Sequence, residues 1–497
     1  MAQRHMDRLT SFDTSFLTNE RSNGHMAIGA VLICAGDPPS HDDFVAHIHS
    51  RLHLLPRLRQ RLAFPPLRFG TPFWIDDRGF DLANHVRRTT LPPPGDDAQF
   101  HELVGEVLSP PLDRSRPLWE LVLVEGFEEH RFAIVYKTHH ALADGFSAVD
   151  IGTLLFDVEP KSEPVREEAP WDPHEPPSGG ALVARAVAGV WATARRMARG
   201  LRNAARRPER ARKRAADGLA GLWEVTRNLA RPAPKVPLNV EIGAARSFSW
   251  AGFVLDDFKL IKNALGVTVN DVILAATAGA LRRWLHDREI STEGMELKAL
   301  VPVSIRTENE QGELGNRLTA MRGPLPVGVA DPVERLRIVH EAMEELKSSK
   351  QPLGAEAIWG LNDWFRDFAP PLLLAPTASI NFSTRLFNLL VTNFPGPQIP
   401  IYVLGRELAG VYPVGFLARR HALAIASISY NGQVNFGILA DRASMPDAER
   451  ISSYLGEAVE ELLAAARIAS GDKGDGDQLA GDTRPRFARA RERLGGS

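Results

Sequence analysis

Cysteine is almost absent from this sequence of 497 residues, which contains only Cys34. A single cysteine excludes an intrachain disulfide and any zinc site built from several cysteines, and it leaves both a reducing compartment and a disulfide-free exported fold open. No apolar run reaches the roughly 18 residues that favour a membrane-spanning helix, because prolines interrupt the apolar stretch 368–380. The polar start is unlike a secretory signal, so we expect any membrane contact to be peripheral.

An excess of one charge is also lacking, since 59 Lys and Arg residues face 61 Asp and Glu residues. The formal charge of -2 lacks the basic bias of nucleic-acid-binding proteins, and we expect no nucleic-acid partner. This balance hides a segregation of charge. Residues 181–235 hold 14 basic and three acidic side chains, a local charge of +11, so the remaining residues carry -13.

The length and the pattern of the sequence predict two α/β halves joined by a linker. The N-terminal half spans 1–157 and the C-terminal half 238–469, and both alternate short strand patterns with helical ones. Between them, residues 158–237 hold a Pro- and acid-rich linker followed by the basic insertion, and 470–497 are expected to form a disordered tail. The expected strands are 28–34, 121–124, 132–138, 247–255, 297–304 and 423–430, and the expected helices are 42–54, 99–108, 269–285 and 447–468.

The basic insertion predicts an amphipathic helix over residues 183–201, which Pro208 should end. A weaker apolar pattern follows at 219–229. Two interpretations stay open: the helix lies on an anionic lipid surface, or its apolar stripe docks on the protein's own domains. Its apolar stripe consists of Val183, Val187, Val190, Ala194, Met197 and Leu201, and arginines occupy the other half.

The most informative segment, residues 131–156, predicts a strand, a tight turn and a helix. If the strand continues to its end, His139 and His140 point to opposite faces and cannot chelate one metal ion. His140 would then lie beside an apolar face, where desolvation keeps an imidazole neutral and available as a base. Gly145 permits the turn, and Asp144 can hold the local structure or pair with a cation.

These residues alone leave three interpretations of the two histidines open. They could belong to a metal site, they could be structural groups satisfied at a strand end, or one could act as a general base. Ser147 is disfavoured as a nucleophile because the sequence has no GxSxG elbow. The sequence also has no phosphate-binding GxxxxGK[ST] motif and no internal repeat.

The segment HHALADG reproduces the HHxxxDG signature of coenzyme A-dependent acyltransferases and resembles the bacterial wax ester synthase/diacylglycerol acyltransferase family. The signature alone also fits condensation domains and carnitine or chloramphenicol acyltransferases, whereas the PLW and NDV blocks favour the narrower family. The resemblance covers roughly residues 9–469, apart from the linker and the basic insertion. The matching blocks are LTSFDTSFL (9–17), HMAIGAVL (25–32), FDLANHV (80–86), LPPPG (91–95), PLDRSRPLWE (111–120), VNDVILA (269–275), PVSIR (302–306), GN (315–316), TNFPGP (392–397) and NFGILAD (435–441).

The resemblance implies an α/β fold of two chloramphenicol-acetyltransferase-like domains around a central active-site tunnel. It implies direct transfer of a fatty acyl group from acyl-CoA, as a co-substrate, to diacylglycerol or to a long-chain alcohol, with no bound cofactor and no metal. His140 is then the general base, His139 supports its geometry and Gly145 forms the turn. The protein is expected on the cytoplasmic side, peripheral to a membrane or lipid droplet.

Further site residues follow from the same blocks, each with a structural alternative. Asn270, which precedes Asp271, would stabilise the oxyanion or would only cap its helix. Arg306 would pair with Asp144 or would be a surface arginine. Trp119 would pack in the core, although it could line the acyl tunnel.

The sequence departs from the family at two positions of one block, and two other functions stay open. TNFPGP has Thr392 and Phe394 where the family more often has Ser and Val, which could reshape a tunnel wall. A condensation-type acyltransferase with a carrier-bound donor is one other function, and the absence of a fused carrier domain counts against it. A non-catalytic lipid-binding protein of the same fold is the other, and the retained His140 and Asn270 count against it.

Overall fold

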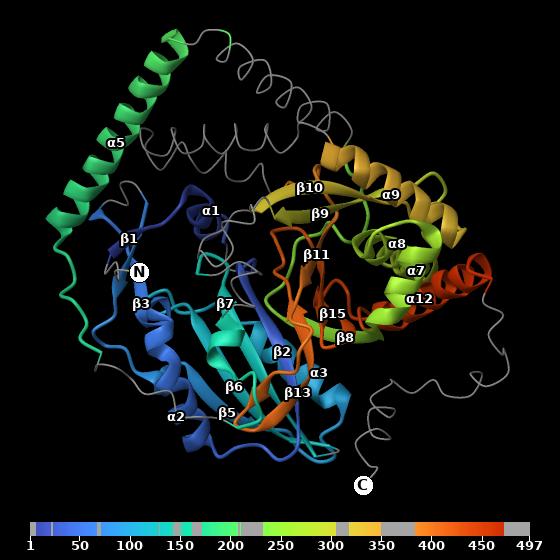
Figure 1. Cartoon of the computed structure of the whole chain (residues 1–497), viewed down its shortest axis with the longest axis horizontal. Coiled ribbons are helices and arrows are strands. Elements are labelled where there is room, and N and C mark those ends of the chain that lie inside the picture. The colour runs from blue at the N-terminus through green and yellow to red at the C-terminus, as the bar shows by residue number, and fades with distance from the viewer. Residues whose placement is uncertain are drawn as a thin grey trace.

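The structure of this chain is a computed structural model in which two lobes, each built around a β-sheet, lie side by side (Figure 1). The interpretations of Asp144, Gly145, Ser147, Arg306, the pattern 219–229 and the tail beyond 471 concern positions outside the described residues. The structure describes residues 6–20, 23–66, 71–128, 130–142, 151–161, 171–206, 209, 232–304, 318–348 and 383–471.

The N-terminal lobe contains a six-stranded mixed sheet whose order is β12-β13-β2-β7-β6-β5. Its central strand β7, Arg131–His139, pairs antiparallel with β2 and with β6, and it is buried over nearly its whole length. The other strands of this sheet are β2 (Ala27–Ala35), β5 (Val86–Thr90), β6 (Trp119–Phe127), β12 (Tyr402–Val403) and β13 (Arg406–Val414). Its helices include α1 (Ser11–Asn19), α2 (His41–Arg51) and α3 (Asp97–Leu108).

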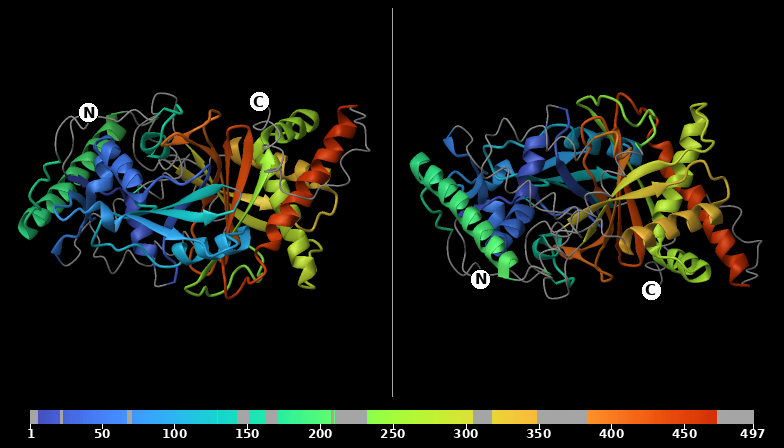
Figure 2. Two further views of the ribbon diagram at one scale, coloured as in Figure 1. Left: turned by 90° about the horizontal axis from the view of Figure 1, so that it is seen from below. Right: turned by 90° about the horizontal axis from the view of Figure 1, so that it is seen from above.

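The C-terminal lobe contains a second six-stranded mixed sheet, of order β10-β9-β11-β14-β15-β8. Helices cover the side of this sheet that faces away from the N-terminal lobe (Figure 2). The strands are β8 (Arg246–Val254), β9 (Leu297–Ser304), β10 (Leu318–Leu325), β11 (Leu389–Pro395), β14 (Leu423–Tyr430) and β15 (Gln433–Asp441). The helices are α7 (Leu255–Leu265), α8 (Val269–Asp287), α9 (Pro332–Ser348) and α12 (Arg450–Ala469).

The second half of the chain contributes a pair of strands to the N-terminal sheet, which the sequence pattern does not indicate. β12 and β13 come from the second half of the chain, yet β13 pairs antiparallel with β2 of the N-terminal sheet, with Val414 opposite Gly29. A Cβ atom at Gly29 would come within 2.0 Å of the Tyr136 carbonyl oxygen on β7, so this close packing requires glycine. The mixed sheets with flanking helices confirm the expected α/β class, and the expected division at residues 157 and 238 stays a prediction.

Local sequence signals explain where several helices begin. The Ser40 hydroxyl accepts a hydrogen bond from the Asp43 amide and caps α2, while Asp96 and Gln99 form a capping box at α3. The strands expected at 297–304 and 423–430 occur with those bounds. The helix expected over 447–468 begins three residues later than expected, at Arg450.

The basic insertion forms the predicted helix, α5, which extends over Gly179–Arg206 at the edge of the N-terminal lobe beside β1 (Figure 1). It lies against a small sheet of order β1-β4-β3. The strands of this sheet are β1 (Met6–Arg8), β3 (Gln60–Ala63) and β4 (Phe73–Asp76).

The described part of α5 docks on the protein through a face that is offset from the centre of the predicted apolar stripe. Leu182 and Ala186 are buried, and a Cβ atom at Gly189 would come within 2.3 Å of the Arg8 guanidinium. At about 100° per residue, these positions are centred about 90° away from the centre of the predicted stripe. Small residues on the docked face allow this close approach. Away from that face, Val187 is 39% exposed and Trp191 is 64% exposed.

Among the described helices, none alone is long and apolar enough to span a membrane; only α7 and α8 together, bent by 100° at their junction, reach that length and composition.

Candidate active site

A large apolar cavity lies between the two sheets. Its volume is about 1140 Å³, counting the space at its open mouth. Its wall comes from β2, β7 and β13 of the N-terminal sheet, from β11 and β14 of the C-terminal sheet, and from residues 151–156. A long cavity with few polar groups is suited to an aliphatic chain.

His140 lies on the wall of this cavity, directly after the last residue of β7. Its ring stacks on Phe16 of α1 with centroids 3.9 Å apart and meets Phe416 edge-on at 5.6 Å. Its backbone N–H donates to the Met26 carbonyl oxygen over 2.9 Å, which ties the position of the ring to the start of β2. His140 is 8% exposed, and it reaches the cavity from between these two phenylalanine rings.

The strand register gives the cavity a direction. On β2, the lining residues run from Ile28, opposite Thr138, to Leu32, opposite Ile134. Tyr136 lies three residues before His139, the last residue of β7, about 10 Å from it at the rise of a strand. Burial raises the pKa of Tyr136 to about 12, so its hydroxyl is neutral. The cavity therefore extends from His140 along the strands into the space between the sheets.

His139 is buried beside His140, but its ring is held by polar contacts. Its Nδ1 accepts a hydrogen bond from the Ala141 amide over 3.0 Å, so the ring proton is on Nε2, which donates to Glu20 over 3.3 Å. Burial raises the pKa of Glu20, but hydrogen bonds and electrostatic attraction from His139 and Arg114 outweigh it and bring the pKa to about 2. Glu20 is thus an ionised anchor for the His139 ring.

The expectation that the two histidines point to opposite faces applies to a strand that continues through both of them. The strand ends at His139, so this condition is not met at His140. His140 belongs to the turn that follows, and both rings reach the segment that begins with α1, where Phe16 and Glu20 are four residues apart. Only His140 of the pair lines the cavity. Among the described residues, no group of three or more His, Cys, Asp or Glu side chains could hold a metal ion.

Asn270 is the second residue of α8 and is half-buried. The alternative that Asn270 caps this helix is wrong, because Thr268 is the N-cap. The Thr268 hydroxyl accepts from the Asp271 amide over 3.2 Å, and the Asp271 carboxylate accepts from the Thr268 amide over 2.9 Å. Asp271 also bonds His340 over 2.8 Å and is fully buried, which gives it a structural role. Asn270 is not one of the described residues that line the cavity.

Trp119 packs in the core of the N-terminal lobe, as one of its two interpretations states. Its indole N–H donates to the Leu58 carbonyl oxygen over 2.7 Å, and its ring stacks on His85 with centroids 4.7 Å apart. It is fully buried and is not among the described cavity-lining residues. The two departures in TNFPGP do line the cavity, since Thr392 and Phe394 both lie on its wall.

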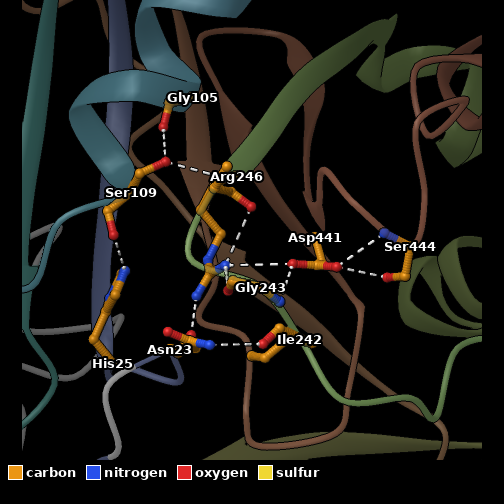
Figure 3. Close-up of polar contacts among 10 residues, drawn as sticks. Asn23, His25, Gly105, Ser109, Ile242, Gly243, Arg246, Asp441 and Ser444 are labelled. Carbon is orange, nitrogen blue, oxygen red and sulfur yellow. Dashed lines mark hydrogen bonds and ion pairs between the residues drawn. The ribbon is translucent and has the colours of Figure 1, made fainter.

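A polar junction just before β2 was not indicated by any sequence motif (Figure 3). The buried guanidinium of Arg246, on β8, donates to the Asn23 and Gly243 carbonyl oxygens and lies 3.7 Å from Asp441 at the end of β15. The Arg246 amide donates to the Ser109 hydroxyl over 2.9 Å. These contacts tie the C-terminal lobe to the end of α3.

The same junction reaches the segment that holds His140. The Ser109 carbonyl oxygen lies 3.1 Å from Nε2 of His25 (Figure 3). The carbonyl oxygen of the next residue, Met26, accepts a hydrogen bond from the His140 amide. Burial and the charges of Arg246 and Lys137 lower the pKa of His25 to about 4, so this ring is neutral near pH 7. Only the fold brings these residues together, because they are far apart in the sequence.

Comparison with known proteins decides the family. A sequence model of the wax ester synthase/diacylglycerol acyltransferase catalytic domain matches residues 9–273, and a model of the C-terminal domain of the same family matches residues 314–463. The chain belongs to the wax ester synthase/diacylglycerol acyltransferase family. The probable diacylglycerol O-acyltransferase tgs1 of Mycobacterium tuberculosis is 32% identical over 478 residues, 93% of this chain and 97% of that protein. The probable diacylglycerol O-acyltransferase tgs2 of the same species is 31% identical over 480 residues, 93% of this chain and 100% of that protein.

Solved structures support the same assignment. A wax ester synthase/diacylglycerol acyltransferase from Marinobacter aquaeolei VT8 is 27% identical and superposes with a TM-score of 0.64, covering 93% of this chain and 100% of that one. The first condensation domain of the calcium-dependent antibiotic synthetase shares the fold, with 15% identity and a TM-score of 0.56 over 93% of this chain and 96% of that one. In this wax ester synthase/diacylglycerol acyltransferase family member, the pairing of Asp144 with Arg306 stays a prediction.

Proposed function

We propose that this protein transfers a long-chain fatty acyl group from acyl-CoA to the free hydroxyl of diacylglycerol, forming triacylglycerol and CoA. Long-chain alcohols are a related class of acceptor and would give wax esters. The observation that carries this proposal is His140 on the wall of a long apolar cavity, in a chain of this family. An imidazole at that position can act on the acceptor hydroxyl when the aliphatic chains of the acyl donor and of the acceptor occupy the cavity.

In the proposed reaction, His140 takes the proton of the acceptor hydroxyl as its oxygen attacks the thioester carbonyl carbon. The tetrahedral intermediate then collapses, the C–S bond breaks, and the imidazolium returns the proton to the departing thiolate. General-base catalysis of this kind contributes about 10²–10⁴-fold in rate. His139 and Glu20 support the turn that carries His140.

Asn270 is the proposed donor to the developing oxyanion. Because Thr268 caps α8, the side-chain amide of Asn270 is not needed to cap this helix. A side-chain donor of this kind is worth about 2.7–4 kcal/mol in the transition state. Acyl-CoA enters as a substrate and leaves as CoA, so the proposed reaction needs no resident cofactor.

The purified full chain, labelled palmitoyl-CoA and either dioleoylglycerol or hexadecanol test this function. We expect labelled triacylglycerol, with His140→Ala reducing its rate by about 10²–10⁴-fold. His130→Ala is the matched control, because the His130 side chain is 91% exposed. Near-normal transfer by His140→Ala together with loss in His139→Ala would show that the base is misassigned. Turnover only with a carrier-bound donor would favour the condensation-type reaction, and lipid binding without turnover would favour a non-catalytic protein.

We further propose that the protein is peripheral to a membrane or lipid droplet and that α5 contacts the anionic lipid. On the helix, Val187 and Trp191 lie in the half opposite the docked face, and Trp191 is 64% exposed. The exposed arginines Arg195 and Arg202 lie within about 40° of Trp191 on the same side. Apolar residues flanked by arginines match the surface of an anionic bilayer.

Sedimentation with phosphatidylglycerol-containing vesicles tests this contact. We expect Trp191→Glu to lower partitioning about tenfold or more, because it removes apolar surface and adds repulsion. Ile468→Glu is the control, since Ile468 is an 82% exposed apolar residue on α12. Equal binding of Trp191→Glu and the unaltered protein would refute the proposed contact.

A further inference from the structure

The wall of the cavity contains a buried hydroxyl with no hydrogen-bond partner among the described residues. Thr392 on β11 is 6% exposed, it lines the cavity, and its Oγ1 is one of the unsatisfied buried atoms. The Tyr430 hydroxyl in the same wall is engaged, because it donates to the Leu408 carbonyl oxygen over 3.0 Å and accepts from the Ile401 amide over 2.8 Å. The Tyr136 hydroxyl in the wall also lacks a hydrogen-bond partner among the described residues, but Tyr136 lies three residues before the end of β7, about 10 Å from that end at the rise of a strand. A buried hydroxyl without a partner is unfavourable unless a ligand supplies one.

Thr392 lies one step along β11 from Leu390, which marks the end of the cavity where His140 is found. It lies on the same face of β11 as Leu390 and Phe394, and all three residues line the cavity. A Cβ atom at Gly415 would lie 3.6 Å from Leu390, and the next residue, Phe416, contacts the His140 ring. Thr392 is two residues further along β11 than Leu390, about 7 Å at the rise of a strand.

A diacylglycerol bound with its free hydroxyl at His140 must place its ester groups in this part of the cavity, because they are only a few bonds from that hydroxyl. An ester carbonyl oxygen accepts hydrogen bonds and cannot donate, so it needs a donor from the wall. We propose that the Thr392 hydroxyl donates to an ester carbonyl of the acceptor and thereby favours diacylglycerol over a long-chain alcohol. This inference rests on the proposed transfer to diacylglycerol.

The same contact explains how one apolar cavity can discriminate between two acceptors. A long-chain alcohol has only methylene groups where diacylglycerol has its esters, so the Thr392 hydroxyl stays unpaired when the alcohol is bound. A site built to bond a polar group disfavours the analogue that lacks it, since the buried donor is then unsatisfied. The aliphatic remainder of both acceptors meets the same apolar wall.

The test compares Thr392→Val and Thr392→Ser with the unaltered full chain, using palmitoyl-CoA as the donor. Dioleoylglycerol, its dialkyl ether analogue without carbonyl groups, and hexadecanol serve as acceptors. We expect Thr392→Val to lower kcat/KM for dioleoylglycerol by about 2- to 10-fold, as for one uncharged hydrogen bond. The values for the ether analogue and for hexadecanol should stay within about twofold, and Thr392→Ser should restore the preference.

Thr277→Val is the matched control, because the buried Thr277 hydroxyl bonds the Ile273 carbonyl oxygen within α8, away from the cavity. It should leave the ratio of the two acceptors unchanged. An equal loss of activity with all three acceptors, or no loss with any, overturns the role of Thr392. Failure of the unaltered protein to acylate dioleoylglycerol instead overturns the proposed function, so the two failures are distinguishable.

Discussion

Gly152 provides a direct test of whether the cavity holds the aliphatic chain of the acyl donor. It lies in a helical segment with Ile151, Leu155 and Phe156, and all four line the cavity, whereas Leu154 is 41% exposed. At about 100° per residue, the four lining positions fall within an arc of about 140°, and Gly152 lies inside it. Apart from the two chain neighbours and the backbone of its own helical turn, no atom of the described residues lies within 4 Å of a Cβ atom built at Gly152. A larger side chain at this position therefore extends into the cavity.

The substitutions Gly152→Ala, Gly152→Val and Gly152→Leu fill the cavity in steps. Each methylene of the donor that the new side chain displaces loses about 0.8 kcal/mol of burial, which is about fourfold in kcat/KM. Gly152→Leu should therefore lower activity with palmitoyl-CoA relative to decanoyl-CoA by at least tenfold, with the smaller side chains intermediate. The assay is competition between the two donors at one acceptor concentration.

The control is Gly456→Leu in α12, another helical glycine with no described atom within 4 Å of its Cβ position. Replacing glycine in a helix interior adds about 1 kcal/mol of stability, so neither variant should fail to fold for that reason. An unchanged chain-length preference in Gly152→Leu, or the same change in both variants, would falsify the assignment of this cavity to the acyl chain.

Three predictions concern stability. Asp441→Ala should lower the free energy of unfolding in urea by about 3–5 kcal/mol, because it leaves the guanidinium of Arg246 buried without its counter-charge; a loss below 1 kcal/mol would contradict this. Thr268→Ala removes the cap of α8 and should lower the free energy of unfolding by about 1 kcal/mol. Thr153→Ala, at a half-buried threonine outside this helix, is the comparison. Acid should destabilise the protein, because burial lowers the pKa of four histidines to about 4 and the unfolded chain binds their protons first. The free energy of unfolding should thus be highest above about pH 6.5 and fall progressively as the pH is lowered towards 4, and a melting temperature that stays constant over this range would refute this prediction. These histidines are His25, His47, His101 and His421.

The pattern of the sequence predicts those elements whose stability depends on nearby residues. The strands 297–304 and 423–430 are apolar runs with clear ends, and α8 begins where Thr268 and Asp271 can cap it. The pairing of β13 with β2 could not be predicted, because it depends on contacts between positions more than 370 residues apart. The docked face of α5 could not be predicted either, since Gly189 is favoured there by the close approach of Arg8 rather than by hydropathy.

The candidate site also combines features that the sequence predicts with contacts that only the fold determines. The end of an apolar strand places His140 against an apolar surface, and this much follows from alternation along the chain. The partners of the two histidines do not follow, because Phe16, Glu20 and Met26 reach them from a distant part of the sequence. Thr392 and Phe394 line the cavity, in agreement with the tunnel wall that the resemblance suggests for them, but which residues they face there depends on the fold.

The contribution of β12 and β13 to the N-terminal sheet bears on how fragments of this protein behave. Without β13, the nine-residue strand β2, whose sequence is AIGAVLICA, would become the edge of its sheet with unpaired backbone N–H and C=O groups. Long apolar edge strands of this kind pair with other chains and aggregate. A fragment that ends before residue 402 would therefore keep the HHxxxDG histidines but expose a template for insoluble assembly, and only the full chain protects it.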